Sequence, residues 1–380
     1  MNKYQKYFSK FLAANAKSTH FACHSHHYWP DCTYEAQKEY WNDSCKYVDD
    51  KWEHIFSKKI PKVQKLISKV LDFDRPADIT FAPNTHELVY RILSSFDKKI
   101  KILTTDSEFY SFSRQLSRLI EADLIEATIV KIDPIENFEE RFLAASEESH
   151  DLVFISQVFF NSGIALRNFT NFTKKLIANS EHILIDGYHA FMAVPTSLKE
   201  IGDKIFYIAG SYKYAAGGEG CCFMTIPKDC SLRPKNTGWF ADISTLDNNS
   251  SEAIDYPNDG MRFAGSTMDF SALYRLTSIL ELYEEETINV EVIHKHVQSC
   301  QKKFLDEIKR IQHPKLNIEN LIFRGFENHG HFLTFELKNS SEVSEVKEKL
   351  KKIGMVTDSR ENRLRFGFSI YHDGKYRIEI

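Results

Sequence analysis

The stretch Gly210-Ser-Tyr-Lys213-Tyr-Ala-Ala-Gly-Gly-Glu-Gly220 decides what fold and what chemistry we expect of this chain. Apolar runs at 204–209 and 221–226 flank it, and both have the pattern of buried strands. Because the stretch is too rich in glycine for a helix, Lys213 stands in a loop at the mouth of a strand. A lysine withdrawn from water loses its proton more easily and becomes a nucleophile toward an aldehyde. An exposed loop lysine is the plain alternative.

A second segment, 182–195, places an acid at the end of another short apolar strand. Asp186 ends that strand, and His189 follows three positions later. Ligands of α/β sheets bind outside the carboxyl ends of the strands, which is where Asp186 falls. A lysine that holds an aldehyde and a carboxylate that keeps a ring nitrogen protonated are the two groups that a pyridoxal phosphate (PLP) enzyme requires. The two segments therefore predict a PLP site.

Taken together, the two segments resemble the class V branch of the fold-type I PLP-dependent enzymes and are most similar to kynureninase. The resemblance rests on Asp186-Gly-Tyr-His189 and on Ser211-Tyr-Lys-Tyr214 with the glycines that follow it. It implies an α/β fold, with a large, mostly parallel seven-stranded sheet that carries helices on both faces, and a small C-terminal α+β domain.

The order of predicted elements suggests where the domains divide. Charged helices and short strands alternate past about residue 290, as in a small α+β domain. We expect an N-terminal arm, helical over its first 20 residues, and scaffold helices over 1–60. A large PLP-binding domain is expected over 61–285 and a small domain over 286–380.

The cofactor residues are inferred partly from local chemistry and partly from the resemblance. Asn84 and Thr85 open a helix after a predicted strand at 78–83, and a helix N-terminus attracts phosphate, although ordinary capping would look the same. The resemblance implies that Lys213 binds the aldehyde, that Asp186 pairs with the ring nitrogen and that His189 supports it. It further implies that Phe109 stacks on the ring, that Asn84, Thr85 and Tyr212 bind the phosphate, and that Trp239 contacts the cofactor. Ser266 and Thr267 would reach the cofactor from the partner subunit of a homodimer.

Arg365 is the expected ligand of the substrate's α-carboxylate. Arg363 and Arg365 are two apart, so both point to one face of a strand. The segment 354–372 matches the C-terminal pattern of kynureninase, and Arg365 is the matching arginine, suited to a bidentate contact. Arg363 as the ligand, or both as surface charges, remains an alternative.

The early loop Cys23-His-Ser-His-His27 is dense in possible ligands. Four ligands within five positions cannot easily surround one tetrahedral ion, so we expect no metal site. The resemblance places this loop at the substrate pocket, with Ser25, His26 or His27 as a contact and His26 as our choice. Trp239, in a Gly-Trp loop like that of kynureninase, is expected to line the same pocket.

These assignments predict a hydrolase of kynureninase type that converts an L-kynurenine-like amino acid to alanine and an aromatic acid. Lys213, Asp186 and Tyr212 would be its catalytic residues, with Tyr212 carrying a proton. A class V aminotransferase or another PLP-dependent lyase of small amino acids is the alternative. A cysteine desulfurase would need a mobile cysteine late in the chain, where Cys300 is the last. Phe159 stands where the family has asparagine. A binding or structural protein whose active site has lost its activity is therefore a third possibility.

Composition limits the other possibilities. Of 380 residues, 42% are hydrophobic and 27% charged, as in an ordinary globular protein. The net charge of −4, without a basic block, predicts no nucleic-acid partner, and no apolar run is long enough for a membrane span. The N-terminus has no signal-peptide pattern, and seven scattered cysteines favour reduced thiols, so we expect a cytoplasmic protein.

Overall fold

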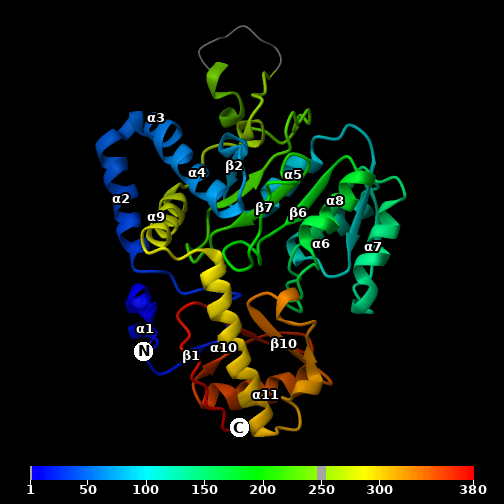
Figure 1. Cartoon of the computed structure of the whole chain (residues 1–380). Coiled ribbons are helices and arrows are strands. Elements are labelled where there is room, and N and C mark those ends of the chain that lie inside the picture. The colour runs from blue at the N-terminus through cyan, green and yellow to red at the C-terminus, as the bar shows by residue number, and fades with distance from the viewer. Residues whose placement is uncertain (1, 246–253) are drawn as a thin grey trace.

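A seven-stranded sheet forms the centre of the computed structural model, which describes residues 2–245 and 254–380 (Figure 1). The strand order is β2-β8-β7-β6-β5-β3-β4, and β8 is antiparallel to both of its neighbours while the other pairs are parallel. The strands are β2 (Ile79–Ala82), β3 (Ile100–Thr105), β4 (Ile125–Val130), β5 (Leu152–Ser156), β6 (Ile183–Asp186), β7 (Phe206–Gly210) and β8 (Cys222–Thr225). This confirms the expected α/β fold.

The sheet is buried on both faces, as parallel sheets usually are. Successive side chains of a strand point to opposite faces, so Val153 and Ile155 of β5 join one core cluster while Leu152 and Phe154 join the other. Helices α5 (Thr85–Leu93) and α6 (Tyr110–Glu121) cover the face of Phe154, whereas α7 (Phe138–Ser146) and α8 (Phe169–Asn179) cover the other face. The alternation explains why short apolar runs predicted these strands well.

The N-terminal region wraps helices around one side of the sheet domain (Figure 1). Helix α2 packs along α9, and α4 packs against α9 as well. The prediction of a helical arm over residues 1–20 is partly wrong, since the helix ends at Ala14 and Thr19–His20 form a strand that pairs with Met355–Val356. The helices of this region are α1 (Ser9–Ala14), α2 (Cys32–Tyr47), α3 (Lys51–His54), α4 (Ile60–Leu71) and α9 (Ser271–Glu285).

Helix α10 (Val290–Ile311) leads from the sheet domain into a smaller C-terminal unit (Figure 1). That unit has a four-stranded antiparallel sheet of order β12-β13-β10-β9, covered by α10 and α11. The sequence predicted two or three strands there and missed β12, which is short and polar. The division of the chain into three regions at residues 60 and 285 stays a prediction. The elements are β9 (Leu321–Ile322), β10 (Phe332–Glu336), α11 (Ser340–Lys352), β12 (Asp358–Arg360) and β13 (Arg363–Gly367).

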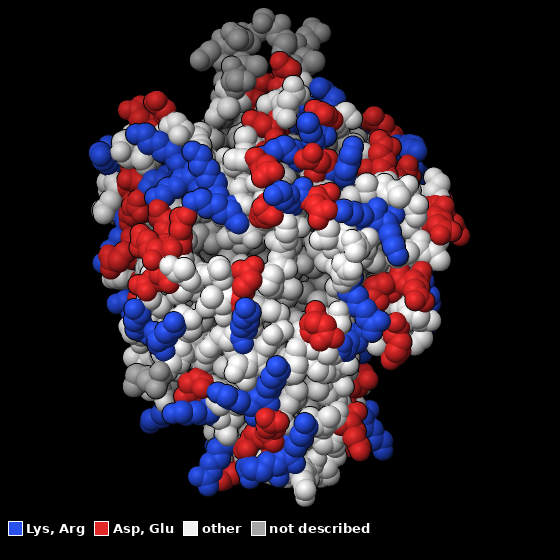
Figure 2. Space-filling model, viewed as in Figure 1, with Lys and Arg blue, Asp and Glu red and all other residues white. Residues whose placement is uncertain are grey.

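Positive and negative side chains are interspersed on the face of the molecule seen in Figure 2. Within the described residues, no helix is both long enough and apolar enough to cross a lipid bilayer.

Candidate active site

The loops that follow β2, β3, β6 and β7 converge on a cavity of about 190 Å³. Seven of the residues predicted for the cofactor line it, although the chain separates the first from the last by more than a hundred positions. They are Asn84, Thr85, Phe109, Asp186, His189, Tyr212 and Lys213. A cavity of this size suits one compact ligand, because pockets for drug-sized molecules begin at roughly 300 Å³.

Lys213 is buried, with 5% of its surface exposed, and its Nζ lies 2.5 Å from Nε2 of His189. Burial lowers the pKa of Lys213 to about 7, and the nearby charge of Arg365 contributes in the same direction while Asp186 opposes it. Burial and the charge of Lys213 also lower the pKa of His189 well below its ordinary value. The amine is therefore neutral in a large fraction of molecules at neutral pH, which a nucleophilic amine requires.

We expect Lys213 of the cofactor-free protein to react with acetic anhydride with a midpoint near pH 7. Competitive isotope labelling followed by mass spectrometry measures this for one lysine at a time. In urea the midpoint should return to about 10.4, the value of an unperturbed lysine. Between the two values the unfolded chain binds more protons, so the free energy of unfolding should rise with pH across that range. An equal midpoint in native and unfolded protein would contradict the assignment.

Two carboxyl groups lie together near the end of the sheet. Burial raises the pKa of Asp186, while Lys213 and the backbone N–H of Tyr188, which donates to Oδ1 at 2.8 Å, oppose that rise. Glu108 is fully buried beside it, and burial with the charge of Asp186 raises the pKa of Glu108 to about 8. Glu108 accepts hydrogen bonds from Thr105 and from the backbone and hydroxyl of Ser156, so it joins the ends of β3 and β5.

Phe109 and the start of α5 complete the predicted cofactor residues. Phe109 is the residue just before α6, and the centroid of its ring lies 5.2 Å from the Lys213 Nζ. Asn84 caps α5 by accepting a hydrogen bond from the Glu87 N–H at 2.9 Å. Asn84 and Thr85 face the same cavity, so the positive end of the α5 dipole is directed into it.

Arg365 is close enough to Lys213 for its charge to lower the pKa of that lysine, but it is not part of the cavity wall. Its side chain is 3% exposed, and it donates to the Phe160 carbonyl at 2.5 Å and to the Asp358 carboxylate. Arg363, two residues earlier, instead pairs with Glu336 at 3.2 Å in a more exposed position. The structure thus separates the two arginines that the sequence could not distinguish.

Four further predicted residues, like Arg365, lie outside the cavity lining that the described chain provides. His26 is exposed, and its ring centroid lies 6.3 Å from that of Tyr212. Trp239 packs against Trp52 of α3. The indole N–H of Trp239 donates to the Thr267 hydroxyl at 3.1 Å. Ser266 and Thr267 are exposed. This chain alone therefore does not place Trp239 at the pocket, and the roles of all four stay predictions.

The segment that carries Ser266 and Thr267 is fastened to α5. Arg91 donates to the Phe263 carbonyl at 2.9 Å and forms an ion pair with Glu87 at 2.7 Å. A Cβ at Gly265 would lie 2.2 Å from the Arg91 guanidinium, so the glycine makes room for this close approach. No sequence pattern predicts this contact, because an arginine in an amphipathic helix is usually a surface charge.

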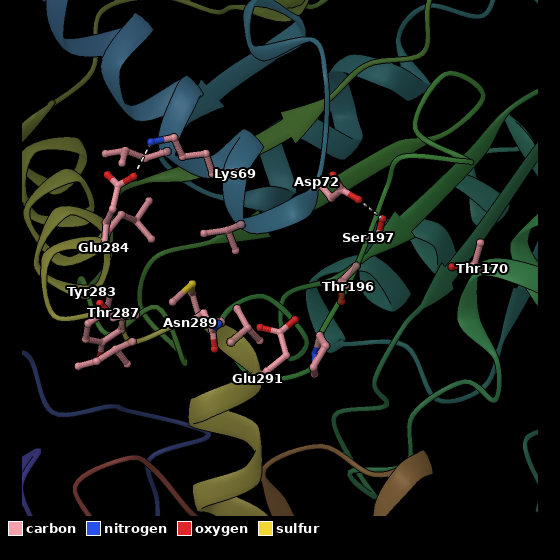
Figure 3. A pocket seen from close by; sticks show the side chains of 17 residues that line it. Lys69, Asp72, Thr170, Thr196, Ser197, Tyr283, Glu284, Thr287, Asn289 and Glu291 are labelled. Atoms are coloured by element: carbon pink, nitrogen blue, oxygen red, sulfur yellow. Dashed lines mark hydrogen bonds and ion pairs between the residues drawn. The ribbon is translucent and has the colours of Figure 1, made fainter.

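A larger cavity of about 720 Å³ lies between α4, α9 and the start of α10 (Figure 3). Three of its charged side chains are engaged with other protein groups: Lys69 pairs with Glu284, and Asp72 accepts a hydrogen bond from Ser197 at 2.8 Å. Among the described residues that line this cavity, no lysine lies beside a histidine and a buried acid. The smaller cavity at Lys213 is therefore the candidate active site.

The residues of the small cavity fit PLP. An amine, a carboxylate, an aromatic face and a helix N-terminus border one compact space. Among the described residues, the buried Nδ1 of His189 has no hydrogen-bond partner, as expected where a polar ligand is to be added.

Comparison with known proteins bears on the fold. No family model and no curated protein matches the sequence. The chain has the fold of the fold-type I PLP-dependent enzymes, which is the fold that the resemblance had implied.

Several solved structures share that fold. A mutant of C-DES with glycine covalently linked to its PLP cofactor has a TM-score of 0.81 and 17% identity, over 98% of this chain and 96% of that chain. The cystine C–S lyase C-DES in complex with its reaction product cysteine persulfide has a TM-score of 0.79 and 17% identity, over 94% and 95% of the two chains. The apo cysteine desulfurase from Thermococcus onnurineus NA1 has a TM-score of 0.77 and 15% identity, over 96% and 94%. The finer resemblance to kynureninase stays a prediction.

Proposed function

We propose that the protein is a PLP-dependent enzyme that acts on a small α-amino acid and breaks a bond at its β-carbon. One observation carries this proposal: a buried lysine, with its pKa near 7, shares a compact cavity with Asp186 and the N-terminus of α5. When bound, PLP withdraws electrons from the α-carbon of the amino acid, so that bonds at the α- and β-carbons break more easily.

Different residues of this chain would hold different parts of the cofactor. Lys213 would bind the aldehyde and, once released, take up a proton at Nζ, with His189 orienting it at 2.5 Å. Asp186 would pair with the ring nitrogen. Asn84, Thr85 and Tyr212 would hold the phosphate, and Phe109 would cover the ring. Ser266 and Thr267 are proposed to contribute from the second subunit of a homodimer, together with Trp239.

The substrate would be held by its α-carboxylate at Arg365. The guanidinium donates a hydrogen bond to the Asp358 carboxylate, and its fork of donors suits a carboxylate ligand. His26, near Tyr212 at the mouth of the site, is the proposed contact for the substrate's side chain.

The cysteines favour a lyase that releases its leaving group over a desulfurase that keeps sulfur on its own thiol. Cys300 is 2% exposed inside α10. Cys222 lines the cavity, but burial raises its pKa to about 12, so its thiolate is scarce. Fold similarity does not distinguish the two, because a C–S lyase and a cysteine desulfurase both share this fold. We therefore propose β-elimination from a sulfur-containing amino acid such as cystine, which with water gives pyruvate, ammonia and a persulfide.

Hydrolysis of kynureninase type is the second candidate. The match of residues 354–372 and the Gly238-Trp239 loop to kynureninase favour it. Its substrate and water would give alanine and an aromatic acid. A class V aminotransferase would use the same lysine, aspartate and arginine.

Purified protein, reconstituted with PLP and incubated separately with cystine and L-kynurenine, tests these readings. We first expect a visible absorbance band from bound PLP. Borohydride reduction should then attach the cofactor permanently to the peptide that contains Lys213. Pyruvate with persulfide from cystine supports the lyase, whereas anthranilate with alanine from L-kynurenine supports the hydrolase. If no PLP binds, the proposed function is wrong.

A further inference from the structure

Arg275 of α9 has no part in the function proposed above, yet it contacts the loop that carries Lys213. Its side chain is buried, with 8% of the residue exposed. The guanidinium Nε donates to the Gly217 carbonyl and Nη2 donates to the Glu219 carbonyl, both at 2.8 Å. Its Nη1 donates to the amide oxygen of Gln37 in α2 at 2.6 Å. One arginine therefore fastens the lysine loop to two helices.

The burial of this guanidinium is costly, because the acceptors that it bonds are uncharged. Besides the two carbonyls and the amide oxygen, Nη1 contacts the Ser271 hydroxyl at 3.2 Å. Removing a guanidinium from water costs free energy, and neutral oxygens compensate for that loss less well than a carboxylate does. Such a cost is expected where the position of the bonded loop matters.

The loop 211–221 needs contacts from outside because part of its backbone is strained. Ala216 has a φ of 57°, a left-handed conformation that is unfavourable for alanine. Gly218 and Gly220 have φ values of 70° and 106°, which glycine adopts without that cost. An unsupported loop would relax most easily at Ala216.

Hydrogen bonds within the loop connect the bonded turn to Lys213. The Gly217 N–H donates to the Ser211 carbonyl at 2.7 Å, and the Ser211 hydroxyl donates to the Gly218 carbonyl at 2.5 Å. The Ala216 N–H donates to the Lys213 carbonyl at 2.9 Å. A shift of the turn would therefore be passed to the backbone of the lysine.

Trp29 packs on the same turn. A Cβ at Gly218 would lie 2.3 Å from the Trp29 ring, and the Arg275 guanidinium carbon lies 5.1 Å from the centroid of that ring. The guanidinium and the indole thus contact each other as well as the turn. The next two residues, Glu219 and Gly220, line the Lys213 cavity, so the held turn is also part of the cavity wall.

We propose that Arg275 is a positioning residue of the active site, which holds the turn 217–220 in place and with it the Lys213 amine. The part that concerns cofactor binding rests on the proposed function, because it takes PLP as the ligand. Without the guanidinium, two carbonyls of the turn would lose their donor, and the turn would move until water or another donor satisfied them.

Acetylation of Lys213 in cofactor-free protein tests the proposal without PLP. The original chain should show a midpoint near pH 7, because the amine is buried. In Arg275→Gln the loosened turn should admit water to the amine, so the midpoint should rise toward the value of an unperturbed lysine, about 10.4. Arg275→Lys keeps the positive charge without the planar fork of donors, so it should show most of the same rise.

Titration with PLP, followed by absorbance, is the second measurement. The Kd should be about tenfold higher for Arg275→Gln, because hydrogen bonds from a charged donor that position the amine are lost. Methylguanidine, too dilute to unfold the protein, should lower the Kd of Arg275→Ala part of the way toward that of the original chain. Should Arg275→Gln fail to fold, Arg275→Lys serves for both measurements.

Arg262 supplies the matched control. It is likewise buried, with 7% exposed, and donates to the Pro257 and Leu232 carbonyls, both at 3.1 Å, which belong to other loops. Arg262→Gln should lower the urea concentration of half-unfolding, as Arg275→Gln does, but leave the Lys213 midpoint and the Kd for PLP unchanged.

An unchanged Lys213 midpoint and an unchanged Kd in folded Arg275→Gln or Arg275→Lys protein overturn the proposal. Equal changes in Arg262→Gln overturn it too, since they would show that any loss of stability has this effect. If the original chain itself binds no PLP, it is the proposed function that fails, whereas the acetylation midpoints still decide the role of Arg275.

Discussion

Replacing Lys213 by alanine is expected to lower turnover by at least about 10³-fold and to abolish covalent attachment of PLP. Under the proposed function, this amine would do two things that no other described residue of the cavity can take over: it would bind the aldehyde, and it would exchange a proton with the substrate at Nζ. His189, at 2.5 Å, can accept a proton, but the pKa of its buried imidazole is held too low for it to retain one at neutral pH. Lys213→Arg should be equally inactive, because a guanidinium stays protonated and is no nucleophile.

Folding and specificity controls accompany this substitution. Lys204→Ala changes an exposed lysine just before β7 and should keep full activity. Lys213→Ala should unfold at a urea concentration no lower than the original chain, since the buried amine contributes a desolvation cost that alanine lacks. Small primary amines added to Lys213→Ala should restore part of the turnover by supplying the missing proton acceptor. A Lys213→Ala protein that keeps a tenth of the original activity would show that the lysine is not the catalytic amine.

The elements that position Lys213 were predictable because each depends on local sequence. Strands such as β6 and β7 are short apolar runs, Asp186 is the last residue of β6, and Lys213 stands in the loop just after β7. The pairing of strands from distant segments then brings these residues together without further information. Asn84 was found for the same reason, since a capping asparagine is a local signal.

The contacts that could not be predicted join side chains far apart in the chain. Trp239 packs on Trp52 of the N-terminal region, and the sequence of the Gly-Trp loop does not predict that contact. No contact was predicted for Tyr188, yet a Cβ at Gly210 would lie 2.3 Å from its hydroxyl, so the glycine leaves room for this side chain. Glu108 is buried because three hydrogen bonds satisfy it, and two of them come from Ser156, 48 positions away.

Breaking the buried pair of Asp358 and Arg365 is the second large effect that we expect. Asp358→Asn should lower the free energy of unfolding by about 3–5 kcal/mol, because it leaves the Arg365 guanidinium buried without its counter-charge. Arg365→Gln should cost a similar amount, since Asp358 would lose its buried counter-charge and keep the Ser359 N–H at 2.7 Å, Arg360 at 3.4 Å and the neutral His24 at 3.5 Å. The double variant should lose less than the sum of the two, because it leaves neither charge unpaired.

The same pair should make the fold sensitive to acid. Burial alone raises the pKa of Asp358, but the neighbouring His24 and the charges of Arg365 and Arg360 outweigh it and hold the pKa below its ordinary value. A carboxyl with a lowered pKa contributes stability that is fully present above the unfolded value of about 3.9 and is lost as the pH falls below it. Urea unfolding at pH 7 and below pH 4 should therefore show the gap between Asp358→Asn and the original chain narrowing in acid.

The neighbouring pair of Arg363 and Glu336 on the same strand supplies the matched control. It is more exposed, so Arg363→Gln should change the free energy of unfolding by no more than about 1 kcal/mol. The two arginines should also differ in binding: Arg365→Gln should raise KM for the amino acid with a smaller effect on kcat, because the α-carboxylate is held equally in the ground and transition states, whereas Arg363→Gln should change neither. If Arg363→Gln raised KM while Arg365→Gln affected stability alone, the carboxylate ligand would be Arg363, and the buried arginine would serve only to join β13 to β12 and to the loop after β5.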